Sequence, residues 1–246
     1  MMTKTEITFS FHNSDCLEFM EDMKDDSIDL IVTDPPYIIN LGKNGTSKLY
    51  HKKTSIYASE ALKKIANGFN ITQTLNQFKR ICKKANFFIF CSNQQIYDLF
   101  RWSKQNNMIA TVLVWYKTNA MPFAGNSWRP NIEYIIHVKE KGAFLHGNSK
   151  ELSKVWVGGT NPSRYGHPTE KPLKLILNLV KVGSREGDTV FDPFLGSGTT
   201  AEACFHLKRN FVGCELEKAY FNTSVQRVKD ASAQLSLFGG EAIINS

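Results

Sequence analysis

Residues 191–200, FDPFLGSGTT, constrain the fold more than any other stretch of this chain. Residues 189–192, TVFD, have the pattern of a short buried strand, and a helix-forming run begins at Thr199. So sharp a passage from strand to helix favours glycine, which tolerates positive φ and close backbone approach. The stretch therefore predicts a strand, a glycine turn and a helix whose free N–H groups suit a carboxylate or a phosphate.

A second turn follows another apolar, β-branched strand at residues 27–33. Here Asp34-Pro35-Pro36-Tyr37 sets a carboxylate, two prolines and an aromatic ring in succession. Each proline fixes its own φ and drives the preceding residue out of the helical region, so the segment is a stiff hook. Its acceptor oxygens and flat ring suit a planar group that bears an NH2, as on adenine or cytosine. The alternative is a helix-capping aspartate with a packed tyrosine.

The rest of the chain alternates strand and helix patterns, which predicts a doubly wound α/β fold in a single domain over residues 1–246. Further strands are expected at 86–90, 109–115, 133–139 and 210–214, and helices at 70–84, 94–102, 172–182, 199–207 and 217–231. Segments 38–70, 117–130 and 140–166 lack periodicity and are expected to be functional loops, and 232–246 a flexible tail. Within the first loop, residues 38–58 are expected to become ordered only on a nucleic acid.

Charge is unevenly spread along this basic chain, whose net charge is +7. Residues 1–34 hold nine acids and two bases, whereas residues 38–84 hold ten bases and one acid, Glu60. Such a block favours a polyanionic partner, most simply nucleic acid, over a solvated lysine face. The absence of a signal-peptide pattern, of a 20-residue apolar run and of any CxxC pair among five cysteines predicts a cytoplasmic protein with buried free thiols.

The glycine turn also constrains the cofactor. Glu215 ends the next predicted strand, 23 residues after Asp192, about where a dinucleotide fold places its ribose-binding acid. The third glycine of GxGxxG is missing, however, and no GxxxxGK[ST] sequence is present, so neither a dinucleotide nor a P-loop nucleotide fits well. An adenosyl ligand with a carboxylate tail fits what remains.

With both turns in view, the chain resembles the beta class of DNA amino-methyltransferases, which use S-adenosylmethionine. The resemblance rests on DPPY at 34–37 and FDPFLGSGTT at 191–200, with support from HPTEKP at 167–172, GCELE at 213–217 and Asn13-Ser14-Asp15. It covers most of the chain and implies a Rossmann-like sheet in permuted order, with the catalytic motif before the cofactor motif. No metal or covalent intermediate is implied.

The resemblance also implies roles for single residues. The carboxylate of Asp34 and the carbonyl of Pro35 would hold the target amino group, Pro36 completes the hook, and Tyr37 would stack on a base flipped out of the duplex. The residues expected around the cofactor are Asp15 at adenine, Lys171 at the carboxylate, Glu215 at the ribose, and Gly196, Ser197, Gly198 and Thr199 around the methionine end. Asp192 and Phe194 are also expected to bind the cofactor. In the simpler alternatives Asp15 only caps a helix, Lys171 is solvated and Asp192 is structural.

The target base follows from the first residue of the hook. Adenine-N6 enzymes of the family commonly carry DPPY and cytosine-N4 enzymes more often SPPY, so Asp34 favours adenine. Cytosine N4 and a DNA-binding protein that retains the fold without turnover are the alternatives. Residues that could read bases or fill the gap left by the flipped base are Asn126, Trp128, Arg129 and residues 164–165. In the alternative, these residues only pack within their loops.

The tail contains Gln234-Leu235-Ser236-Leu237-Phe238, which resembles the peptide that docks replication and repair proteins on the bacterial sliding clamp. Leu237 and Phe238 would fill an apolar pocket, with Gln234 and Leu235 beside it. In the alternative, the leucines and the phenylalanine fold back on the core. Expected partners are thus double-stranded DNA, a sliding clamp and, in a homodimer, a second copy of the chain.

Overall fold

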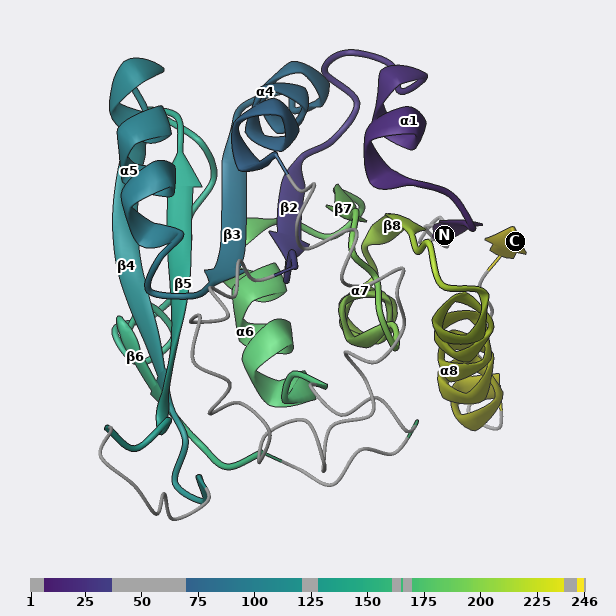
Figure 1. Ribbon diagram of the computed structural model, residues 1–246. Coiled ribbons are helices and arrows are strands. Elements are labelled where there is room, and N and C mark those ends of the chain that lie inside the picture. The colour runs from purple at the N-terminus through teal and green to yellow at the C-terminus, as the bar shows by residue number, and fades with distance from the viewer. Residues whose placement is uncertain are drawn as a thin grey trace, which may run out of the picture.

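A nine-stranded sheet with the order β6-β4-β5-β3-β2-β7-β8-β1-β9 forms the centre of the molecule (Figure 1). The computed structural model describes residues 7–36, 70–120, 128–160, 165, 170–236 and 243–245. Outside them lie Tyr37, the expected loop at 38–58 and the greater part of the loop at 38–70, and also Asn126, Arg164, Leu237 and Phe238.

The strands are β1 (Thr8–His12), β2 (Leu30–Thr33), β3 (Asn86–Cys91), β4 (Ile109–Tyr116), β5 (Ile132–Lys139), β6 (Val155–Val157), β7 (Thr189–Asp192), β8 (Asn210–Cys214) and β9 (Ile243–Asn245). Six of these strands, β2, β3, β4, β5, β7 and β8, agree closely with the six predicted from the sequence. β5 pairs antiparallel with β3 and β4, whereas the other pairings are parallel. β2 and β3 are buried throughout, as expected of parallel strands covered on both faces.

Helices cover the two faces of the sheet in two sets (Figure 1). α1 (Cys16–Glu21), α4 (Ile71–Ile81) and α5 (Ile96–Gln105) lie on one face, and α6 (Leu173–Gly183), α7 (Thr199–Leu207) and α8 (Lys218–Ser236) on the other. Each set packs on its own apolar core, one around Phe78 and Phe87, the other around Phe88 and Phe211. The predicted doubly wound α/β fold is confirmed.

The two sequence motifs meet at the centre of the sheet. β2 and β7 are neighbours, with Leu30 opposite Val190 and Ile31 opposite Phe191. From β2 the chain proceeds to β3 on one side, and from β7 to β8 on the other, so this pair marks the topological switch point. Ligands of open α/β sheets bind at the carboxyl ends of the strands at such a point, which is where Asp34 and the glycine turn emerge.

The structure differs from the sequence-based expectation at the tail. α8 continues to Ser236, five residues beyond the predicted end at Ala231, and β9 pairs in parallel with β1, so these parts of 232–246 are not a free tail. β6 likewise lies within the expected loop at 140–166. β6 and β9 have three residues each, too few to show the alternation from which a strand is predicted.

All five cysteines are buried and unpaired, which confirms the free thiols expected from the sequence. Within the described part of the chain, no helix has the length and apolar character that crossing a membrane requires.

Gly183 ends α6 against the sheet, and a Cβ there would lie 2.8 Å from Phe88 Cε2 and 2.9 Å from Leu30 Cδ1. We expect Gly183→Val to lower the free energy of unfolding by about 1–3 kcal/mol, because overpacking shifts a close-packed core. Chemical denaturation measures the change. Lys174→Val, on the exposed side of the same helix, is the control, with an expected loss within about 0.5 kcal/mol. Equal losses in the two variants would contradict the close contact.

Candidate active site

The buried carboxylate of Asp192 joins the two motifs. Its Oδ1 accepts hydrogen bonds from Thr33 Oγ1 at 2.8 Å and from the backbone N–H of Phe194 at 3.1 Å, and its Oδ2 accepts from Thr200 Oγ1 at 2.7 Å. Burial raises the pKa of Asp192 to about 6. Through these bonds Asp192 ties the residue before Asp34 to the glycine turn and to α7, which is a structural role.

Asp34 forms an ion pair with a lysine that is distant in sequence. Lys171 Nζ lies 2.5 Å from Asp34 Oδ2 and 5.1 Å from the centre of the Phe90 ring, and the lysine side chain is only 8% exposed. The other carboxylate oxygen, Asp34 Oδ1, is shielded from solvent and has no hydrogen-bond partner among the described residues. Asp34 therefore keeps one acceptor atom for a ligand while the other is held.

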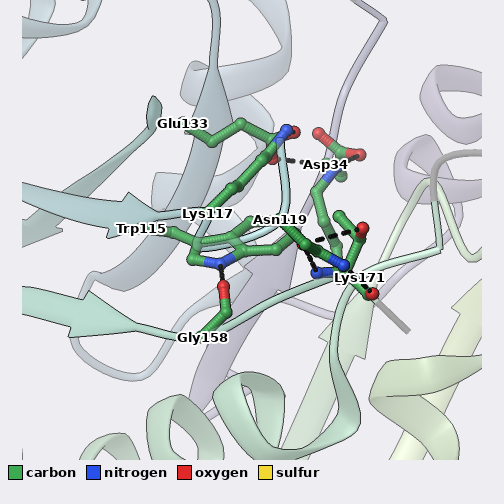
Figure 2. A network of polar contacts seen from close by, with 8 residues as sticks. Asp34, Trp115, Lys117, Asn119, Glu133, Gly158 and Lys171 are labelled. Carbon is green, nitrogen blue, oxygen red and sulfur yellow. Dashed lines mark hydrogen bonds and ion pairs between the residues drawn. The ribbon is translucent and has the colours of Figure 1, made fainter. Parts of the chain in front are cut away.

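Lys171 is shared with a second carboxylate, and Figure 2 shows the group. Its Nζ lies 3.4 Å from Glu133 Oε2, and Lys117 Nζ lies 2.5 Å from Glu133 Oε1. Burial alone would lower the pKa of Lys171, but the charges of Asp34 and Glu133 outweigh burial and raise it. Burial would likewise raise the pKa of Glu133, but Lys171 and Lys117 outweigh it and lower that pKa. Lys171 and Glu133 thus stay charged at neutral pH.

These contacts give Lys171 two protein partners that the sequence did not predict. Its ammonium contacts the catalytic hook, and a role at the cofactor carboxylate stays a prediction. Glu133 and Lys117 were not among the residues predicted from sequence. They lie 99 and 83 positions from Asp34, on β5 and directly after β4, and no local pattern marks such partners.

The hook is also held at its second proline. Gln95 Nε2 donates to the carbonyl of Pro36 at 3.1 Å, and Gln95 Oε1 accepts from the N–H and the hydroxyl of Ser92. Gln95 is completely buried at the start of α5, and Pro35 is buried as well. This glutamine, which sequence reasoning also missed, fixes the course of the backbone directly after Asp34.

The glycine turn closes on a carboxylate. Gly196 and Gly198 have φ of +54° and +83°, as the motif predicts. The N–H of Gly196 donates to Glu215 Oε2 at 2.8 Å, and the N–H of Glu217 donates to Glu215 Oε1 at 2.9 Å. Burial raises the pKa of Glu215. The predicted cofactor residues Gly196 and Glu215 are therefore brought together, with Phe194, Ser197 and Thr199 in the same turn.

Gly198 serves packing as well as backbone conformation. A Cβ at this position would lie 2.9 Å from Cα and Cβ of Ser224 in α8. The motif predicted that another group approaches the backbone closely at this glycine. Among the described residues, that group is Ser224 of the neighbouring helix α8. A larger residue at Gly198 would alter the fold as well as the site.

A buried arginine contacts the glycine turn. Arg227 of α8 is paired with Glu202 at 2.5 Å and with Glu170 at 2.9 Å, and its Nη1 donates to the hydroxyl of Ser197 at 3.3 Å. The guanidinium lies 4.9 Å from the centre of the Tyr165 ring. Arg227 was not predicted from the sequence. One local feature could have indicated its burial: Arg227 lies on the same helix face as Ser224 and Val228, which are both fully buried.

The N-terminal motif borders a hollow. Asp15 caps α1 by accepting from the N–H groups of Leu17 and Glu18, so its simpler role is realised and a contact with adenine stays a prediction. Asn13 Nδ2 donates to the carbonyl of Glu215 at 2.8 Å. A hollow of about 730 Å³ opens here between the end of β1, α1 and α8. Its lining is polar and aromatic: Phe11, His12, Asn13, Ser14, Phe221 and Asn222 are among the residues that form it.

Three of the residues expected to read or replace a base are described. Trp128 is 96% exposed, whereas Arg129 is held by the carbonyl of Ala120. Tyr165 packs on Arg227, and its hydroxyl lies 3.4 Å from Asp230 Oδ2. Trp128 alone of these three is free to meet a large ligand with its whole ring.

The acceptor hook and the glycine turn thus lie together at one switch point of an α/β sheet, and comparison with known proteins specifies the family. A model of the DNA methylase family of the N6/N4 type matches residues 28–226. This match spans most of the chain, so the chain belongs to that family.

Similar proteins agree with this assignment. The Type II methyltransferase M2.MboI of Moraxella bovis is 27% identical over 247 residues, covering 92% of this chain and 90% of the relative. The crystal structure of the M1.HpyAVI–SAM complex has a TM-score of 0.66 and 24% identity, covering 89% of this chain and all of that one. The cytosine-N4-specific PvuII DNA methyltransferase has a TM-score of 0.68 and 15% identity, with 98% and 96% covered. These two likenesses show the fold alone.

The buried amide of Gln95 allows a test of the hook. We expect Gln95→Leu to lower the rate of DNA methylation about 5- to 10-fold, because a buried carbonyl without its donor costs about 1–3 kcal/mol and the hook would shift to reach water. Single-turnover methylation measures the rate. Gln94→Leu, at the exposed neighbouring position, is the matched control and should keep the full rate. A full rate for both variants would show that Gln95 does not position the hook.

Proposed function

We propose that this chain transfers a methyl group from S-adenosylmethionine to the N6 amino group of an adenine in double-stranded DNA. Asp34 carries the proposal: one carboxylate oxygen is held by Lys171, and the other is buried with no hydrogen-bond partner among the described residues. Such an oxygen suits an N–H donor on an incoming planar amine, because a buried acceptor gains most from a new bond. The glycine turn lies on the neighbouring strand end.

The residues at the second strand end fit the methyl donor. Glu215 offers carboxylate oxygens for ribose hydroxyls, and the turn at Gly196 and Gly198 offers backbone groups at a helix N-terminus for a carboxylate. Ser14 Oγ is shielded from solvent and lacks a hydrogen-bond partner among the described residues. Ser14 lines the hollow together with Asn13, whose side chain donates to the carbonyl of Glu215. M1.HpyAVI has been solved as a complex with SAM. When bound, S-adenosylmethionine supplies an electrophilic methyl group on a sulfonium.

The chain's own residues then act on the amine. The lone pair of an adenine amino group is delocalised into the ring, so the nitrogen is a poor nucleophile. An acceptor oxygen on Asp34 and a carbonyl of the hook draw its two N–H bonds out of the ring plane and localise the lone pair. As nitrogen bonds to the methyl carbon and the carbon–sulfur bond breaks, Asp34 Oδ1 accepts the proton that nitrogen loses. The contribution of the protein is orientation and electrostatics.

Adenine is favoured over cytosine by the hook itself. Asp34 heads a DPPY motif, which adenine-N6 enzymes commonly carry. The fold does not discriminate between the two bases, because a cytosine-N4-specific enzyme shares it. Cytosine N4 methylation is therefore the second candidate.

DNA binding follows from charge and from access to the base. Base flipping costs a few kcal/mol, which a stacking aromatic such as Tyr37 offsets in part. The basic block at 38–84 would hold phosphates, so binding should weaken steeply with salt. We propose that residues 1–246 act as a single methyltransferase domain, with the recognition loops at 38–70, 117–130 and 140–166.

Removing the acceptor tests the mechanism. We expect Asp34→Ala to reduce methyl transfer by at least about 100-fold, because it removes the oxygen that stabilises the developing charge. Cofactor affinity should stay within about twofold, since Asp34 contacts Lys171 rather than the glycine turn. Transfer of labelled methyl groups to DNA, followed by nucleoside mass spectrometry, gives both the rate and the product base. N4-methylcytosine would favour the second candidate, and a variant with most of its turnover would refute the mechanism.

The ribose site has its own test. Glu215→Ala should weaken S-adenosylmethionine binding tenfold or more, which corresponds to about 1.4 kcal/mol. It is a cleaner change than Gly198→Val, which would also disturb the contact with Ser224. Glu217→Gln is the control, because Glu217 contacts Glu215 through its backbone N–H, which the substitution keeps. Calorimetric titration that finds equal affinities for both variants would remove Glu215 from the cofactor site.

We also propose that the segment at 234–238 docks on a sliding clamp; a homodimer stays a separate prediction. The sequence QLSLF supports it. Residues 234–236 form the end of α8, so docking in an extended form requires that last turn to unwind. We expect the chain to bind the purified clamp of its host in calorimetry, and Leu237→Ala/Phe238→Ala to abolish binding while methylation of naked DNA persists. Identical binding by both forms would end the proposal.

A further inference from the structure

The four charged residues at the hook form an alternating row. Lys117, Glu133, Lys171 and Asp34 follow one another at 2.5, 3.4 and 2.5 Å between nitrogen and oxygen (Figure 2). They come from four places in the fold: after β4, within β5, before α6 and after β2. With two positive and two negative charges, the row is neutral as a whole.

Keeping this row of charges away from water costs desolvation free energy, and the distances between neighbouring charges are unequal. The side chains of Lys117, Glu133 and Lys171 are 17%, 19% and 8% exposed. Desolvated ion pairs of this kind add little to stability compared with apolar residues, so a use in positioning accounts for them better. The contact from Lys171 to Glu133 is nearly an ångström longer than the one to Asp34, which makes Glu133 the weaker of two competitors for one ammonium.

Lys117 sets the strength of this competition. Its Nζ lies 4.8 Å from the centre of the Trp115 ring, and its backbone N–H donates to the carbonyl of Asn131 at 2.8 Å. Trp115 in turn lies opposite Glu133 in the β4–β5 pairing. The lysine is thus fixed on the far side of Glu133, where its charge draws the carboxylate away from Lys171.

We propose that Glu133, backed by Lys117, is a positioning residue that divides Lys171 between two carboxylates and so sets how readily Asp34 takes the proton from the target amine. The inference rests on the proposed function, in which Asp34 Oδ1 is that acceptor. Glu133 itself touches neither the amine nor the methyl donor in this scheme. Its effect passes through Lys171.

Two further groups lie near Asp34 and bear on any pH profile. Cys91 ends β3 and Asp192 ends β7; the charge of Asp34 adds to burial in raising the pKa of each. Asp192 accepts its hydrogen bonds from Thr33, Thr200 and the N–H of Phe194, none of which belongs to the row. Changes at Glu133 and Lys117 therefore alter the row and leave the hydrogen bonds of Asp192 intact.

The test is the pH dependence of the single-turnover methylation rate. In Glu133→Gln, Lys171 has one carboxylate partner in the row, so the acid limb should move to lower pH by on the order of one unit and the plateau should fall. In Lys117→Met, Glu133 competes more strongly with Asp34 for Lys171, and a positive charge near Asp34 is lost. The acid limb should therefore move to higher pH. Opposite shifts are a readout that a merely structural role would not produce.

Controls separate the inference from its basis. Glu140→Gln removes a charge just beyond the other end of β5 and should leave the limb in place, and Lys117→Arg should restore the unchanged profile. Lys117→Gln replaces Lys117→Met if the latter fails to fold. Shifts of the same sign, or none, in an unchanged chain that methylates adenine would overturn the inference alone. Absence of methyl transfer by the unchanged chain would overturn the proposed function and the inference with it.

Discussion

The buried carboxylate of Asp192 is the contact on which the site depends. Its three hydrogen bonds reach the end of β2, the glycine turn and α7, so the two motifs cannot shift independently. The contribution of Asp192 to the free energy of unfolding depends on pH. Because burial raises the pKa of Asp192 to about 6, the folded chain binds this proton more tightly than the unfolded chain does. The stability that this group contributes is therefore greatest below about pH 4 and declines as the pH rises through about 6.

Two adjacent residues then connect the halves of the site. Glu170 pairs with Arg227, which donates to the hydroxyl of Ser197 in the glycine turn, while Lys171 pairs with Asp34 at the hook. A short segment before α6 thus holds a carboxylate toward one motif and an ammonium toward the other. Glu170 and Lys171 lie between the loop at 140–166 and the largely apolar helix α6. Both charges find partners there that only the folded sheet brings within reach.

The fold could be predicted from the sequence, and so could the meeting of the two motifs at one edge of the sheet, whereas the partners of the charged residues at the candidate site could not. Asp34-Pro35-Pro36 and the turn at 191–200 are local signals, because proline and glycine restrict the backbone wherever they occur. The pairing of Lys171 with Asp34 spans 137 positions and depends on strand order, which no local pattern encodes. Gln95 and Arg227 were missed for the same reason: each is a polar residue whose burial follows from packing.

In the proposed mechanism, β2 and β7 bring an acceptor oxygen and a methyl donor to opposite sides of one amino group. The most direct measurement is a crystal structure of the chain with S-adenosylhomocysteine and a duplex that contains its mapped target site. We expect the exocyclic nitrogen of a flipped adenine to lie within about 3 Å of Asp34 Oδ1, while Oδ2 keeps its contact with Lys171. A target nitrogen bound elsewhere, with Asp34 facing only protein, would contradict this mechanism.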